Sequence, residues 1–302
     1  MTSSTAPGVQ DFLNRLRLSI AEFDAYEDAI ARQSSRLKNL SHVTTQRIST
    51  ATILVTLDKA LDLKELDAAI CKASQDSTLE KLLEVQGHIR VRVQPRENKR
   101  SFNNCVTLSF EELPWQDGHA VDCAYNNKAI KFFSNGNLHI TGCVHVRECV
   151  VDLVAKRVLP MLDTLLNSTT IFSMTHFDIQ MINTDTSLDR DVMLDDLKTY
   201  CDTQHEYVPF LNPEQHLALR LVCKDKGHTI MLFSNGKLLI NAPTPGKVVA
   251  ARKYILDLLD THDQMYLSLP QPQPQPQHRT QEPAAKKQKA YRNEAIERAL
   301  WG

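Results

Sequence analysis

Two histidines and two cysteines, side chains that commonly bind zinc, stand close together at His139, Cys143, His145 and Cys149. A cluster of this kind suggests a metal centre. Strand alternation places the first three on one face of an expected strand, but Cys149 falls in the helix that follows. The spacing also matches no common zinc pattern, so we expect no metal to bind here.

Other signatures of catalysis are missing from the sequence. It contains no glycine-rich phosphate loop, no Gly-x-Ser-x-Gly and no convincing pair of catalytic carboxylates. We therefore predict a binding protein that is not an enzyme and that needs no cofactor.

The composition predicts an intracellular protein with a buried core. The chain has 302 residues, of which 42% are hydrophobic, enough to fill one or two domains. Its seven cysteines are odd in number and scattered, which favours a reducing compartment over a disulfide framework. No apolar run reaches membrane-spanning length, and the polar start lacks a secretory signal, so we expect no membrane contact.

One short phrase occurs twice, one hundred positions apart. Residues 131–140 read KFFSNGNLHI and residues 231–240 read MLFSNGKLLI. Ser-Asn-Gly between two alternating runs predicts a tight hairpin, because Asn and Gly accept the positive φ of such turns. A long amphipathic helix follows each copy. We infer an internal duplication with Phe133 and Phe233 in equivalent places, each just before its turn.

The elements that must hold these hairpins also follow a duplicated order. The predicted elements are a strand at 48–57 and helices at 61–73 and 144–166 in the first repeat, and helices at about 191–201 and 245–259 in the second. The predicted boundaries are 1–42 for an amino-terminal amphipathic helix, 43–170 for repeat one with an insertion near 78–128, 171–269 for repeat two, and 270–302 for a Pro/Gln linker and charged tail. The amino-terminal helix buries its apolar stripe either on its own protein or on a partner, and both interpretations stay open.

The order of these elements resembles the TATA-box-binding protein family of archaea and eukaryotes. The residues that carry the likeness are Ile48-Ser49-Thr50, the helix start at Leu61, Thr141-Gly142, Ile179-Gln180, Tyr207-x-Pro209-x-Leu211-x-Pro213, and the two Phe-Ser-Asn-Gly hairpins. The likeness covers residues 43–262. It implies an α+β fold in which two pseudo-symmetric repeats form one curved antiparallel sheet, a saddle, with ten or nearly ten strands and helices on the convex face.

The resemblance also implies a function in transcription initiation. Proteins of this family bind A·T-rich promoter DNA through the minor groove and bend it by wedging apolar side chains between base steps. The implied wedges are Phe102, Phe133, Phe210 and Phe233. The other residues implied to face the groove are Thr50, Lys131, His139, Thr141, Met181, Asn183, Arg220, Met231, Lys237, Leu239 and Asn241.

The expected partners are double-stranded DNA and a transcription-factor-IIB-like protein or RNA polymerase subunits. A partner protein is expected to contact Arg252 and Lys253 on a convex helix, or the amino-terminal helix. An alternative is a saddle that no longer binds DNA and serves as an assembly platform, with residues 78–128 covering its concave face.

Several positions depart from the family pattern. The central minor-groove asparagines are replaced by Thr50 and Met181, with Asn183 two positions later, and the second wedge of repeat two falls on Asn212, beside Phe210. Minor-groove readout mainly separates A·T from G·C, so we expect a weakened TATA preference while bending is retained.

The insertion leaves the second strand of repeat one in one of two registers. Residues 101–110 can form it, with Phe102 in the first wedge position and Leu108 in the place that Arg220 takes in repeat two. Residues 90–96 can form it instead, with Arg92 contacting phosphate. We favour the first register.

The net charge is low for a protein that binds DNA. The whole chain sums to −1, and residues 279–302 carry six basic and three acidic side chains, so the remainder sums to −4. A basic face can coexist with an acidic one, because the local field depends on where charges lie.

So divergent a sequence favours a large DNA virus as its source. The protein would then lie in a viral factory or virion, whereas a cellular protein would lie in the nucleus.

Overall fold

The computed structural model describes residues 7–37, 43, 47–85, 89–94, 104–112, 128–167, 171–212, 214, 216–223, 227–262 and 266–268. Residues up to Ser268 belong to one compact unit, and residues from Leu269 belong to a second. No described helix is long and apolar enough to cross a membrane.

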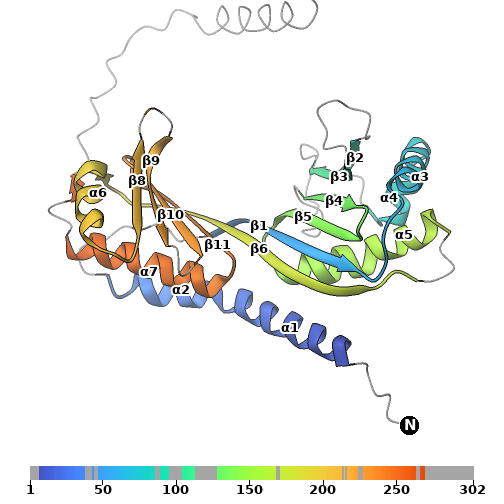
Figure 1. Cartoon of the computed structure of the whole chain (residues 1–302), viewed down its shortest axis with the longest axis horizontal. Coiled ribbons are helices and arrows are strands. Elements are labelled where there is room, and N and C mark those ends of the chain that lie inside the picture. Colours follow the sequence, from blue (N-terminus) through green and yellow to red (C-terminus); the bar gives the residue numbers. More distant parts are fainter. Residues whose placement is uncertain are drawn as a thin grey trace, which may run out of the picture. The chain divides into compact units, whose positions relative to one another are not determined.

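Ten strands form one curved antiparallel sheet within the first unit (Figure 1). Their order along the sheet is β2 (Ile89–Gln94), β3 (Cys105–Glu112), β4 (Ala129–Phe133), β5 (Asn137–Cys143), β1 (Arg47–Leu57), β6 (Met174–Ser187), β11 (Lys237–Ala242), β10 (His228–Phe233), β9 (His216–Cys223) and β8 (Val208–Asn212). This order reads the same from both ends when β1, β5, β4, β3 and β2 of repeat one are matched with β6, β11, β10, β9 and β8 of repeat two. A pseudo-twofold axis therefore passes between β1 and β6, which confirms the predicted α+β fold of two pseudo-symmetric repeats.

Helices cover the convex face of this sheet. They are α3 (Leu63–Gln75), α4 (Thr78–Leu82) and η1 (Arg147–Val158), which continues into α5 (Leu159–Leu165), in repeat one, and α6 (Leu194–Thr203) and α7 (Pro245–Thr261) in repeat two. Side-chain caps mark two of the starts: Asp62 accepts from the backbone N–H groups of Lys64 and Glu65 at the start of α3, and Thr244 accepts from that of Lys247 at the start of α7. A short ribbon of β7 (Asp191–Val192) and β12 (Leu267–Ser268) brings the end of this unit beside the start of α6.

The segment predicted as the insertion of repeat one contains α4, which has no counterpart among the described helices of repeat two, and the edge strand β2, which is the counterpart of β8. Strand β2 pairs with β3, and α4 packs against α3 and α5, on the helix side of the sheet. Neither element covers the concave face. Residues 95–103 and 113–127 of this segment lie outside the described residues.

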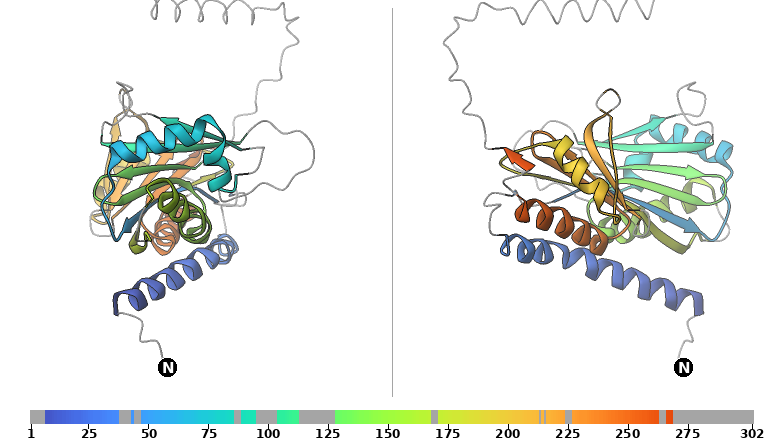
Figure 2. Two further views of the ribbon diagram at one scale, coloured as in Figure 1. Left: turned by 90° about the vertical axis from the view of Figure 1, so that its right-hand side faces the viewer. Right: turned by 60° about the vertical axis from the view of Figure 1, so that its left-hand side comes forward.

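The amino-terminal segment forms two helices that dock on the protein itself. Helices α1 (Pro7–Asp24) and α2 (Tyr26–Ser34) lie alongside α7 (Figure 2). Phe23, Tyr26 and Ile30 are all buried, at 1–3% exposure. Near the start of α1, the Phe12 ring packs edge-on against Phe177 of β6, with 5.7 Å between the ring centroids. Of the two open interpretations, the structure supports packing on the same chain.

This docking overturns the predicted partner contact at Arg252. Its side chain is 0% exposed because α2 covers it. The guanidinium donates from Nη1 to Gln33 Oε1 at 3.1 Å and from Nη2 to Ser34 Oγ at 3.0 Å. Burial among neutral groups lowers the pKa of Arg252. The neighbouring Lys253 is exposed and bonds Asp257 on the same helix.

The two hairpin turns are built in the same way. In each, the glycine N–H donates to the carbonyl of the phenylalanine before the turn, at 3.0 Å in both Gly136 and Gly236. Both glycines have a left-handed φ, 83° and 77°. An added Cβ would lie 2.3 Å from Lys59 O in repeat one and 2.4 Å from Arg190 O in repeat two. Only glycine fits these positions, which explains the repeated phrase.

We expect Gly136→Ala to lower the free energy of unfolding by more than about 2 kcal/mol, because alanine strains at this φ and its Cβ overlaps a backbone oxygen. The matched control is Gly227→Ala. Its φ is also left-handed, at 62°, but the nearest atom to an added Cβ is the flexible Lys247 Nζ at 3.8 Å, so it should cost about 1 kcal/mol. Urea unfolding of both variants measures the difference. Equal losses would mean that the close approach to Lys59 is unimportant.

Candidate nucleic-acid interface

The concave face of repeat two is largely apolar. Alternate residues of its strands point away from the helices, and hydrogen-bonded pairing places them in rows. One row runs Leu239, Met231, Arg220, Phe210 and another runs Asn241, Thr229, Val222, Val208. Phe210 and Val208 remain 48% and 47% exposed. Contiguous rows of exposed apolar side chains are typical of binding surfaces.

The same face of repeat one is polar. Its rows run His139, Lys131, Thr107, Gln94 and Thr141, Ala129, Ser109, Arg92. The neighbours of these residues on the two hairpin strands, Ile130, Phe132, Leu138 and Ile140, are 0% exposed and face the helices. The alternation within both hairpins is therefore as predicted, with Phe133 and Phe233 half-buried on the concave side.

The centre of the face lies on β1 and β6, beside the pseudo-twofold axis. Thr50 stands opposite Asn183, and Thr52 stands opposite Met181, which is 38% exposed. Asn183 also stands opposite Asn241 on β11. The structure thus places two predicted amides on adjacent strands, together with two threonine hydroxyls.

Cations outnumber carboxylates on the concave face. Among the described residues, the cations are Arg47, Arg90, Arg92, Lys131, Arg220 and Lys237, and the carboxylates are Glu111, Asp178 and Asp185. Two of the carboxylates are already paired, Asp185 with Arg47 at 3.1 Å and Glu111 with Arg92 at 2.8 Å. No described carboxylate lies within ion-pair distance of Arg220, which is exposed between Phe210 and Met231. This local excess contrasts with the acidic sum of the chain.

His139 lies directly opposite Lys131 on the hairpin of repeat one. Burial, and then the charge of Lys131, lower the pKa of His139 below its ordinary value. This shift in pKa favours the neutral imidazole.

This shift predicts a pH dependence of stability. Because the folded pKa lies below the unfolded one, the unfolded chain holds the proton more tightly, and stability falls as pH drops below about 6.5. We expect His139→Gln to lose less stability than the unmodified protein between pH 7.5 and 5, in urea titrations at both values. The same loss in both proteins would assign the pH dependence to other groups.

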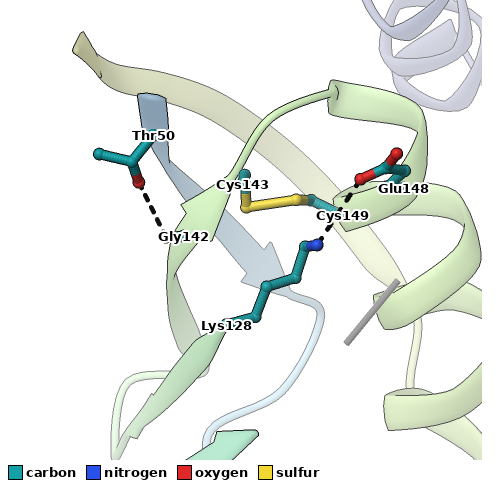
Figure 3. The surroundings of a disulfide bond; sticks show 6 residues. All are labelled: Thr50, Lys128, Gly142, Cys143, Glu148 and Cys149. Atoms are coloured by element: carbon teal, nitrogen blue, oxygen red, sulfur yellow. Dashed lines mark hydrogen bonds and ion pairs between the residues drawn. A yellow bond between two sulfur atoms is a disulfide. The ribbon is translucent and has the colours of Figure 1, made fainter. Parts of the chain in front are cut away.

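The end of β5 is anchored to η1 (Figure 3). Cys143 and Cys149 form a disulfide, and the buried Lys128, 2% exposed, pairs with Glu148 at 3.6 Å. The sequence did not predict this disulfide, because an odd and scattered set of cysteines does not reveal which two the fold brings together. Nearby, Thr50 Oγ1 accepts from the Gly142 N–H at 3.1 Å, which leaves the hydroxyl hydrogen to donate elsewhere.

The candidate metal ligands do not converge. His139 is on the concave face, whereas Cys143 is buried on the helix side and His145 is exposed. Within the described ranges, no three His, Cys, Asp or Glu side chains gather in a way that could hold a metal ion.

The structure corrects the equivalence between Arg220 and Leu108. Strand β3 lies beside β4, as in the favoured register, but Arg220 pairs with Met231 and the equivalent Lys131 pairs with Thr107. Leu108 is 0% exposed and faces the helices. The error is one residue, which is enough to reverse a strand's faces. Phe102 lies outside the described residues.

Sequence reasoning missed several residues of this face. Val208 and Val222 stand two positions from Phe210 and Arg220, so strand alternation alone could have found them. Thr52, Arg90 and Ser109 could not be placed, because bulges in β1 and the insertion in repeat one hid the register.

No protein-family model and no curated protein matches the chain. Among solved structures, the chain is similar to the TBP of Methanococcus jannaschii, with 14% sequence identity and a TM-score of 0.44, over 72% of this chain and 98% of the other. It is also similar to the rolling circle replication initiator protein of Geobacillus stearothermophilus, with 7% identity and a TM-score of 0.31, over 78% and 90%. These likenesses concern the course of the backbone, and the strand order and paired hairpins define the fold without them.

Proposed function

We propose that this protein binds double-stranded DNA through the minor groove with its concave face, bends it, and acts as a transcription initiation factor. The observation that carries the proposal is the composition of this face. Exposed apolar side chains, cations and hydrogen-bond donors share one curved surface that no described helix covers, and a phenylalanine precedes each hairpin turn.

The donors at the centre match the chemistry of the minor groove. An A·T pair presents only acceptors there, adenine N3 and thymine O2, whereas a G·C pair adds an amino group. Thr50, Thr52, Asn183 and Asn241 can all donate hydrogen bonds. A central A·T-rich stretch therefore fits better than a G·C-rich one.

The phenylalanines supply the means of bending. Apolar wedges that partly unstack a base step cost a few kcal/mol and gain contact area on the bent duplex. Phe133 and Phe233 lie at the hairpin ends, and Phe210 is exposed on edge strand β8. Arg220 and Lys237 then lie where phosphates on either side of a widened groove can be contacted.

Of the two partner contacts that the sequence suggested, the amino-terminal helices fit this surface better than Arg252. Helix α2 covers Arg252, so a transcription-factor-IIB-like protein or polymerase subunit that docks on repeat two contacts α1 and α2. Lys253 remains accessible for such a contact.

Fluorescence anisotropy with A·T-rich and G·C-rich duplexes tests the proposal. We expect tighter binding to the A·T-rich duplex and a loss of about tenfold or more for Arg220→Glu, because the variant removes a cation and adds a charge that repels phosphate. Lys64→Glu, a charge reversal on the exposed side of α3, is the matched control and should bind normally. Absence of binding by the unmodified protein would favour the assembly platform.

A further inference from the structure

The strand register assigns each concave residue of repeat one a counterpart in repeat two. The two hairpins align Lys131 with Met231, and pairing across the sheet extends the match outward strand by strand. At six positions repeat two carries Val208, Phe210, Val222, Met231, Phe233 and Leu239. Their counterparts in repeat one are Arg92, Gln94, Ser109, Lys131, Phe133 and His139. Only the phenylalanine before the turn is kept.

This difference divides the concave face by chemistry. Half of it offers broad apolar contact, with Arg220 exposed among the apolar rows and Lys237 beside the hairpin turn. The other half replaces two of the apolar positions by cations, Arg92 and Lys131, and Arg90 adds a third on β2. Apolar surface favours unstacked base edges and sugars, whereas cations bind phosphates and release counterions.

We propose that the two repeats act unequally on DNA: repeat two opens and kinks the minor groove, and repeat one holds the backbone of the other end through phosphate contacts. This inference rests on the proposed function. It makes the complex directional, so that the protein distinguishes the two ends of its site without a partner.

Reciprocal exchanges between equivalent positions test the division. Arg92→Val with Lys131→Met gives repeat one the side chains of repeat two, and Val208→Arg with Met231→Lys does the reverse. Each variant is measured for the slope of log K against log salt, and for bending by energy transfer between the ends of a labelled A·T-rich duplex.

We expect the first exchange to make the salt slope less steep by about two, at about 0.9 per lost phosphate contact, without reducing the bend. The second should bring the energy transfer toward that of the free duplex and should not make the slope less steep. Thermal melting verifies folding, and Val208→Arg alone, at an edge-strand residue that is 47% exposed, replaces the pair if the double variant unfolds.

The outcomes separate this inference from the proposed function. If the unmodified protein binds neither duplex, both fail. Two other outcomes would contradict the unequal roles of the repeats while the proposed function stands. In the first, the protein binds and bends DNA but both exchanges change the salt slope and the bend alike. In the second, the protein binds and bends DNA but the first exchange leaves the salt slope unchanged.

Discussion

Ile30→Ala is expected to lower the free energy of unfolding by about 2–5 kcal/mol, the cost of a cavity at a fully packed aliphatic site. Ile30 is 1% exposed between α2 and α7. The loss should be large because this side chain helps to hold α2 over the buried guanidinium of Arg252. Urea unfolding monitored by far-ultraviolet circular dichroism measures it.

Leu18→Ala is the matched control. Leu18 lies on α1 and is 72% exposed, so its truncation should change stability by no more than about 0.5 kcal/mol. If Ile30→Ala were as mild as Leu18→Ala, the amino-terminal helices would not be docked in solution. They would then be available as a partner-binding arm.

Phe233→Ala combined with Phe210→Ala should abolish most of the DNA bend and weaken binding, while stability falls by less than about 1 kcal/mol for each substitution. Both side chains lie on the concave side, Phe210 exposed and Phe233 half-buried, so we expect truncation to leave no closed cavity. Energy transfer across a labelled duplex reports the bend, and thermal melting reports stability.

Phe132→Ala provides the contrast. Phe132 neighbours Phe133 in sequence but is 0% exposed among the helices, so we expect it to lose about 3–5 kcal/mol of stability. A similar loss for Phe233→Ala would show that Phe233 is a core residue, and the wedge role would be wrong.

The fold could be predicted because its strongest signals are local and repeated. The turn at Ser134-Asn135-Gly136 and its copy specify hairpins by backbone geometry alone, and the period of each helix follows from its own residues. A Cβ added at Gly136 would overlap the carbonyl oxygen of Lys59, and one added at Gly236 would overlap that of Arg190, which is why glycine recurs at these places.

The candidate site was less predictable because it depends on long-range register. A slip of β3 by one residue exchanges the concave position of Thr107 with the buried position of Leu108. Whether Arg92 reaches the concave face depends in turn on whether β2 pairs outside β3. A buried arginine such as Arg252 is also invisible to sequence, since lysine and arginine at the surface of a helix are the usual case. Only the docked α2 reveals its burial.

The most direct test of minor-groove binding is energy transfer on an end-labelled A·T-rich duplex, with and without a groove-filling ligand. We predict that the protein brings the two ends closer. A minor-groove ligand such as netropsin should abolish this change, and a major-groove ligand such as methyl green should not. A duplex that stays straight, or binding that persists with the minor groove filled, would contradict the proposed mode of DNA recognition.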